Sequence, residues 1–176
     1  MIDDKLRQAA AQLLDLCRAR GLTIATAESC TGGLVAATLT EIAGSSDVVD
    51  CGFVTYSNAA KETMLGVPAA TLKRHGAVSA STAAAMAKGA LAHSRADLAV
   101  AITGIAGPGG DTRQKPVGLV YFAAARRDGG KVACARRYGK IGRQRVRARS
   151  VAEALELLRS LAGAGVRSGR KDGGAT

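Results

Sequence analysis

A serine in a run of small residues is the first candidate for chemistry. The segment Thr26-Ala27-Glu28-Ser29-Cys30-Thr31-Gly32-Gly33 separates an apolar run, 22–27, from a run with helical character, 34–43. We expect a strand that ends, a short turn and a helix that begins. Unpaired backbone N–H groups at a helix start favour negative charge, so Ser29 could be a nucleophile whose oxyanion these groups stabilise. The alternative is that Ser29 only caps the helix.

A serine nucleophile needs a base, and the next apolar stretch, 48–57, offers one. Tyr56 lies at the end of this predicted strand, and Lys61 lies in the first turn of the helix that follows. The helix dipole disfavours a cation there, and burial would lower the lysine pKa further, so the neutral amine could accept a proton. We predict Lys61 as the base and Tyr56 as a proton relay or as the group that holds the amine. A solvated lysine and a half-buried tyrosine are the alternative.

Other nucleophiles and bases are less well supported by the pattern. Cys30 is a rival, because helix starts favour thiolates, but its apolar neighbours and its position one residue further on predict that it points into the core. Neither His75 nor His93 has a partner that indicates a Ser-His-Asp arrangement. The four cysteines are widely spaced and form no C-x-x-C pair, so no metal site is expected.

A glycine-rich loop, 104–116, follows the buried strand predicted at 97–103. Its sequence matches neither a P-loop nor a dinucleotide fingerprint. Glycines still allow backbone N–H groups to approach a phosphate or an acyl group, although a tight connection between strands is the alternative. Further on, Arg143 and Arg147 would share one face of a helix, a pattern that usually means a solvated surface.

These candidates require a scaffold, and the order of the periodic segments predicts one. A first helix capped by Asp3 or Asp4 should end at Gly21. The expected strands are 22–27, 48–57, 97–103, 117–126 and 131–138, and the further helices are 32–43, 58–65, 79–94 and 143–162, with a helical turn at 71–75. Strands that alternate with helices and end in a hairpin predict an α/β fold, a three-layer α/β/α sandwich with a mixed, mostly parallel sheet.

Three segments should converge beyond the carboxyl ends of the parallel strands, where such sheets bind ligands. They are 28–33, 55–61 and 103–110. Besides the catalytic candidates, we expect substrate contacts from the first and third segments, at Glu28, Thr31, Gly32, Gly33, Thr103, Gly104, Gly107, Gly109 and Gly110.

Composition limits the class of protein. A chain of 176 residues fits one domain, placed at 1–162, with a basic, glycine-rich tail at 163–176 that we expect to be disordered. The formal net charge of +11 suggests nucleic-acid binding, but the basic segment 126–149 lacks interleaved aromatic residues, so a nucleic-acid partner is not expected. No apolar run reaches membrane-spanning length and the N-terminus lacks a signal pattern, which predicts a cytoplasmic protein.

Five motifs in this order resemble the CinA C-terminal domain family, the nicotinamide-nucleotide amidohydrolases. They are the segment 26–33, here called the serine turn, the strand end 52–58 with Lys61, and the segments 75–79, 101–110 and 115–120. The resemblance covers roughly 6–161. It implies hydrolysis of the carboxamide of nicotinamide mononucleotide to nicotinate mononucleotide and ammonia, a reaction of pyridine nucleotide salvage. It further implies a homodimer and no metal or redox cofactor.

The same resemblance implies catalytic roles for particular residues. The family uses a serine nucleophile, through an acyl-enzyme, with a nearby tyrosine and lysine and an assisting arginine. On this chain they correspond to Ser29, Tyr56, Lys61 and Arg143. The family usually has Gly-Asp-Arg where this chain has Ile141-Gly142-Arg143, so the arginine is kept and the two residues before it depart from the pattern.

Two other functions fit parts of the sequence. A nucleotide-binding module without catalysis would use the same glycine loop, and it would bind the nucleotide without releasing ammonia. A basic nucleic-acid-associated protein would account for the net charge of +11, and it would bind DNA with a steep salt dependence and show no amidase activity.

Overall fold

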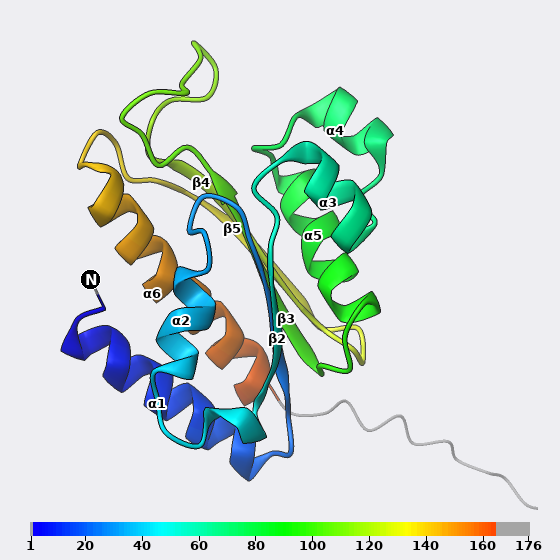
Figure 1. The fold of residues 1–176 in the computed structure, drawn as a ribbon, viewed down its shortest axis with the longest axis vertical. Coiled ribbons are helices and arrows are strands. Elements are labelled where there is room, and N and C mark those ends of the chain that lie inside the picture. The colour runs from blue at the N-terminus through cyan, green and yellow to red at the C-terminus, as the bar shows by residue number, and fades with distance from the viewer. Residues whose placement is uncertain (1, 165–176) are drawn as a thin grey trace, which may run out of the picture.

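The computed structural model describes residues 2–164, in which five strands form one sheet with helices on both faces (Figure 1). The strands are β1 (Ile24–Glu28), β2 (Val49–Val54), β3 (Leu98–Gly104), β4 (Leu119–Arg126) and β5 (Lys131–Arg137). The helices are α1 (Asp4–Ala19), α2 (Leu34–Thr40), α3 (Asn58–Leu65), α4 (Ala69–His75), α5 (Ala80–Ala92) and α6 (Arg143–Gly163), with a short 3₁₀ helix, η1 (Ser45–Asp47). In Figure 1, α1, α2 and α6 cover one face and α3, α4 and α5 the other.

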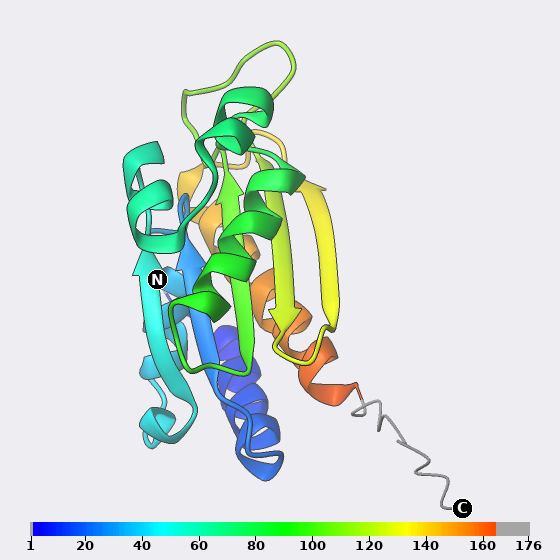
Figure 2. The ribbon, with the colours of Figure 1, turned by 90° about the vertical axis from the view of Figure 1, so that its right-hand side faces the viewer.

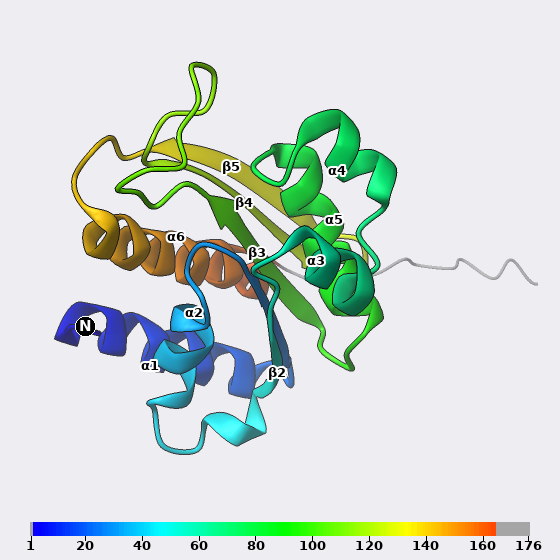
Figure 3. The same ribbon diagram turned by 45° about the horizontal axis from the view of Figure 1, so that its top comes forward.

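The strand order is β2-β1-β3-β4-β5, with β1 parallel to β2 and β3, and β4 antiparallel to both of its neighbours. This confirms the predicted α/β/α sandwich with a mixed, mostly parallel sheet. Glu28 at the end of β1 pairs with Val54 of β2 and with Ile102 of β3. The three parallel strands therefore end at one level, and their following loops leave from the same edge, which comes forward in Figure 3.

The two faces of the sheet differ in the size of their side chains. On β3, Leu98, Val100 and Ile102 pack with α1 and α6, whereas Ala99 and Ala101 pack under α5. Small side chains on that face let the alanine-rich α5 lie close to the sheet. Figure 2 shows α5 in front of the sheet. At Gly89 of α5, a Cβ atom would collide with the Leu65 carbonyl, so α3 also approaches closely. This tight packing fixes α3, which carries Lys61, against α5.

Several expected boundaries shift by a few residues. The second helix begins at Leu34 and not at Gly32, because Gly32 and Gly33 both have positive φ and extend the turn. The last helix continues through Gly163, one residue into the segment expected as the tail, and the expectation of disorder falls mainly on 165–176, outside the described residues. In the part of the chain that the structure describes, no helix is both long enough and apolar enough to span a membrane.

Candidate active site

Ser29 lies one residue beyond the end of β1 and still follows its hydrogen-bond ladder. Its N–H donates to the Ile102 carbonyl of β3 at 3.0 Å. Along β1 the side chains alternate, so that Ala27 packs in the core under α5 while Glu28 turns toward α2. The same alternation turns Ser29 toward the α3 side of the sheet. The Gly32 N–H donates back to the Ser29 carbonyl at 3.1 Å, which closes the turn.

Lys61 meets Ser29 at this edge. Its Nζ lies 3.1 Å from Ser29 Oγ and donates to the Thr55 carbonyl at 2.7 Å, although 32 positions separate the two side chains in sequence. Ser57 caps α3 by accepting from the Ala60 N–H at 3.0 Å, and this fixes the turn that carries Lys61. The lysine is 1% exposed. Among residues 2–164, no carboxylate lies within 4.0 Å of its amine.

The environment of Lys61 suits a base. Burial lowers the pKa of its amine, and the opposing influence of the neighbouring Cys30 is smaller. Burial also raises the pKa of Cys30 to about 12, so that side chain is a thiol and the rival nucleophile is disfavoured. The site thus places a serine hydroxyl beside an amine that loses its proton more readily than an ordinary lysine does.

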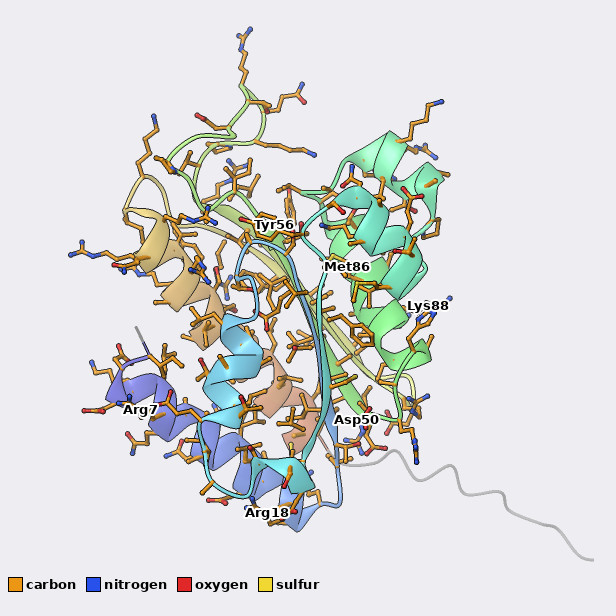
Figure 4. The ribbon with its side chains drawn as sticks, in the orientation of Figure 1. Arg7, Arg18, Asp50, Tyr56, Met86 and Lys88 are labelled. Carbon is orange, nitrogen blue, oxygen red and sulfur yellow. The ribbon has the colours of Figure 1, made fainter. Side chains whose placement is uncertain are left out.

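Tyr56 has a different partner from the one we expected. Its ring is 61% exposed, and its hydroxyl accepts from Arg143 Nη2 at 2.7 Å. Arg143 Nη1 also donates to the Gly107 carbonyl at 3.0 Å. Within the described residues no hydrogen bond joins Tyr56 to Lys61, and the Thr55 carbonyl holds the amine instead. Figure 4 shows Tyr56 beyond the ends of the central strands, between the two helical layers.

Glu28 lies inside the protein and not at the ligand-facing surface we expected. Its carboxylate is fully buried and accepts from the backbone N–H groups of Gly33, Val35 and Ala36 at 3.0, 3.0 and 2.9 Å. It therefore caps α2, and we assign it to positioning of the serine turn. Thr26 Oγ1 also donates to Oε1 at 3.4 Å, so both oxygens are bonded inside the protein and neither is exposed to a substrate.

Replacing Glu28 with glutamine should destabilise the protein by about 2 kcal/mol. The amide nitrogen would face backbone donors that now bond to a carboxylate oxygen, so at least one charge-assisted hydrogen bond is lost inside the core. Urea unfolding of both variants measures the change. The matched control is Glu62→Gln on exposed α3 surface, for which we expect a change within about 0.5 kcal/mol. Equal stabilities of the two variants would contradict the capping role.

The Glu28 contacts narrow the choice of oxyanion donors. We expected N–H groups from Thr31 to Gly33, but the Gly32 N–H bonds to the Ser29 carbonyl and the Gly33 N–H bonds to Glu28. Of the backbone donors in this turn, those of Cys30 and Thr31 have no partner within residues 2–164. The turn thus has two consecutive N–H groups that bond to no other group of residues 2–164.

The third segment contributes mainly through packing. Thr103 is buried and donates to the Ala77 carbonyl at 2.7 Å, and a Cβ at Gly104 would lie 2.7 Å from the Leu119 carbonyl oxygen. Gly107 joins the site through its carbonyl, which bonds to Arg143. Gly109 and Gly110 are exposed on the loop. Within residues 2–164, Gly107 is the one expected substrate contact of this segment that hydrogen-bonds to another candidate site residue.

Arg147 reaches the serine turn, a contact that sequence reasoning missed. Its Nη2 and Nε donate to the Thr31 carbonyl at 2.6 and 3.2 Å. It lies one helical turn after Arg143, so the face that these two arginines share is turned toward the site, with Arg143 exposed at the rim and Arg147 partly buried. Within residues 2–164, no three His, Cys, Asp or Glu side chains gather as a metal site would require.

Known proteins are similar to this chain in both sequence and fold. The CinA C-terminal domain model matches residues 6–162. The nicotinamide-nucleotide amidohydrolase PncC of Escherichia coli (strain K12) is 55% identical over 125 residues, which cover 71% of this chain and 76% of that protein. A CinA-like protein of Synechococcus sp. (strain RCC307) is 50% identical over 161 residues, which cover 89% of this chain and 37% of that protein. The chain thus spans little more than a third of the length of this second relative.

A solved structure agrees with these likenesses. The competence/damage inducible protein CihA from Agrobacterium tumefaciens superposes with a TM-score of 0.90 at 53% sequence identity, over 92% of this chain and 98% of that one. The family model covers nearly all of the described residues, and the motifs around Ser29 and Lys61 lie within it. The chain therefore belongs to the CinA C-terminal domain family.

Proposed function

We propose that this protein hydrolyses the carboxamide of nicotinamide mononucleotide, giving nicotinate mononucleotide and ammonia. The observation that carries the proposal is the 3.1 Å approach of the buried Lys61 amine to Ser29 Oγ. The choice of substrate rests on the similarity to PncC, whose name describes an amidohydrolase of nicotinamide nucleotides. The serine, the base and the unpaired N–H groups are the parts that acyl transfer requires.

The first half of the reaction acylates the serine. Neutral Lys61 takes the proton of Ser29 as Oγ attacks the carboxamide carbon, and the carbonyl oxygen becomes an oxyanion. The N–H groups of Cys30 and Thr31 stabilise this charge. Protonated Lys61 then returns the proton to the amide nitrogen as the C–N bond breaks, and ammonia leaves.

The second half hydrolyses the acyl-enzyme. Lys61, neutral again, accepts a proton from water as the water oxygen attacks the ester carbon, and the same N–H groups hold the second oxyanion. Collapse of this intermediate returns the proton to Ser29 Oγ and releases the carboxylic acid, which gives its remaining proton to solvent and becomes the carboxylate product. The residues invoked therefore return to their starting protonation states after each turnover.

Arg143 is proposed to bind the substrate phosphate. Its guanidinium is exposed at the rim of the site, is held by the Tyr56 hydroxyl and the Gly107 carbonyl, and has no carboxylate within 4.0 Å among the residues described. A planar guanidinium pairs well with phosphate oxygens. Tyr56, in this proposal, orients Arg143 and does not carry a proton.

Arg143→Ala should raise KM for nicotinamide mononucleotide by about 10- to 100-fold with a smaller change in kcat, because a charge-assisted contact to phosphate is lost. Steady-state ammonia release measures both constants. Arg145→Ala, on the same helix and exposed, is the control, and it should behave as the unsubstituted protein does. A loss confined to kcat would place Arg143 at the reacting atoms instead.

The proposal itself is tested by incubating the purified protein with nicotinamide mononucleotide and measuring ammonia and nicotinate mononucleotide in equal amounts. Saturable binding of the nucleotide without ammonia would favour the binding module. Tight DNA binding with a steep salt dependence and no ammonia would favour the nucleic-acid-associated protein. Size-exclusion chromatography with light scattering tests the expected homodimer.

A further inference from the structure

The amino-terminal part of α6 holds the loops that surround Ser29. Arg143 bonds to Tyr56 and to the Gly107 carbonyl, and Arg147 bonds twice to the Thr31 carbonyl. We infer that Arg147 is a positioning residue for the reaction at Ser29: by holding the Thr31–Gly32 peptide through its carbonyl, it restrains the backbone at Thr31 and so the direction of the Thr31 N–H, in the preceding peptide, toward the developing oxyanion. This inference rests on the proposed function.

The serine turn needs such support from outside. Gly32 and Gly33 both have positive φ, and neither has a side chain that could anchor the turn by packing. The internal bonds of the turn are 3.0 Å from the Gly33 N–H to the Glu28 carboxylate, 3.1 Å from the Gly32 N–H to the Ser29 carbonyl, and 3.3 Å from the Leu34 N–H to the Thr31 carbonyl. The 2.6 Å bond from Arg147 Nη2 to that same carbonyl is therefore its shortest restraint.

The contacts of the two arginines predict different kinetic effects. Arg143 is exposed and contacts a tyrosine hydroxyl at the rim, whereas Arg147 is partly buried and contacts the backbone beside the nucleophile. A group that binds phosphate acts on substrate and transition state alike, which changes KM. A group that orients an oxyanion donor stabilises the transition state, where the charge develops, more than the bound substrate, and this changes kcat.

The guanidinium of Arg147 also has no carboxylate within 4.0 Å in the part of the chain that is described. Its positive charge is thus not cancelled by a neighbouring acid. It lies one peptide away from the proposed oxyanion donor, in a partly buried place where electrostatic effects exceed those in water. Positioning and charge act in the same direction, and the lysine variant separates them.

The test compares Arg147→Gln with Arg145→Gln on the same helix. We expect kcat for ammonia release to fall about 10²-fold in Arg147→Gln with KM within about threefold, and both constants to stay unchanged in Arg145→Gln. Arg147→Lys, which keeps the charge but lacks the planar fork, should recover only part of the loss. Thermal unfolding shows that each variant is folded, and if Arg147→Gln is not, the comparison rests on Arg147→Lys.

A second readout does not depend on the proposed substrate. A fluorophosphonate takes the Ser29 oxygen onto phosphorus as fluoride leaves and the serine proton passes to Lys61, through a charged intermediate like that of acyl transfer. Labelling of Ser29, followed by mass spectrometry, should slow at least about 30-fold in Arg147→Gln and not in Arg145→Gln. Equal rates in folded Arg147 and Arg145 variants would overturn the inference. Labelled protein that releases no ammonia from nicotinamide mononucleotide would instead contradict the proposed function alone.

Discussion

Ser29→Ala should abolish ammonia release from nicotinamide mononucleotide, lowering kcat by at least about 10⁴-fold. Without the hydroxyl no acyl-enzyme can form, and only binding and the oxyanion donors remain to assist direct attack by water. The hydroxyl is small and half-buried, so its removal should leave the fold intact. The measurement is ammonia release at saturating substrate, with thermal unfolding of the same sample.

Two further substitutions make this result specific. Ser81→Ala, on the exposed face of α5, repeats the chemical change away from the site and should leave kcat unchanged. Cys30→Ala removes the rival thiol but keeps its backbone N–H, and we expect it to retain at least about a tenth of the activity. Activity lost in Cys30→Ala but kept in Ser29→Ala would assign the nucleophile to the thiol.

The approach of Ser29 to Lys61 could be predicted because topology alone brings their segments together. Parallel strands β1 and β2 end at one edge, and the residue after β1 and the first turn of α3 both leave from it. The alternation of side chains along β1 then decides the side on which Ser29 faces. No long-range detail beyond the strand order was needed for this pair.

The role of Glu28 could not be predicted in the same way. A carboxylate beside a small-residue turn indicates a surface ligand group, and what removes it from the surface is the path of α2, whose N–H groups converge on it. One signal was available: Glu28 has the same strand parity as Ile24, which faces the core shared with α1 and α6. Parity alone does not show where the next helix begins, and that depends on two glycines with positive φ.

The partners of Tyr56 and Arg147 depend on the rotation of α6. The sequence shows that Arg143 and Arg147 share a helical face, but not which face meets the sheet edge. That is set by the apolar residues between and after them, such as Val146 and Val151, which pack in the core with α1. The contacts from Arg143 to Tyr56 and from Arg147 to Thr31 span 87 and 116 positions, and nothing local encodes them.

Lys61→Met should lower kcat by about 10²- to 10⁴-fold, the range expected for loss of a general base. Methionine has a similar length and suits the buried path of the lysine stem, so the protein should remain folded. The control is Lys88→Met on the exposed surface of α5, labelled in Figure 4, for which we expect no change. Lys61→Arg should be as inactive as Lys61→Met, because a guanidinium keeps the charge but cannot give up its proton.

The pH dependence of the unsubstituted protein tests whether Lys61 acts in its neutral form. A base works in its neutral form, so kcat/KM should rise with pH as Lys61 loses its proton. Because burial lowers the pKa of this amine, the midpoint of the rise should lie below 10.5, the ordinary lysine value. Lys61→Met should lose this rise while keeping its low rate across the same range. A rise that persists in Lys61→Met, or full activity in Lys61→Arg, would mean that another group accepts the serine proton and that Lys61 acts only through its charge.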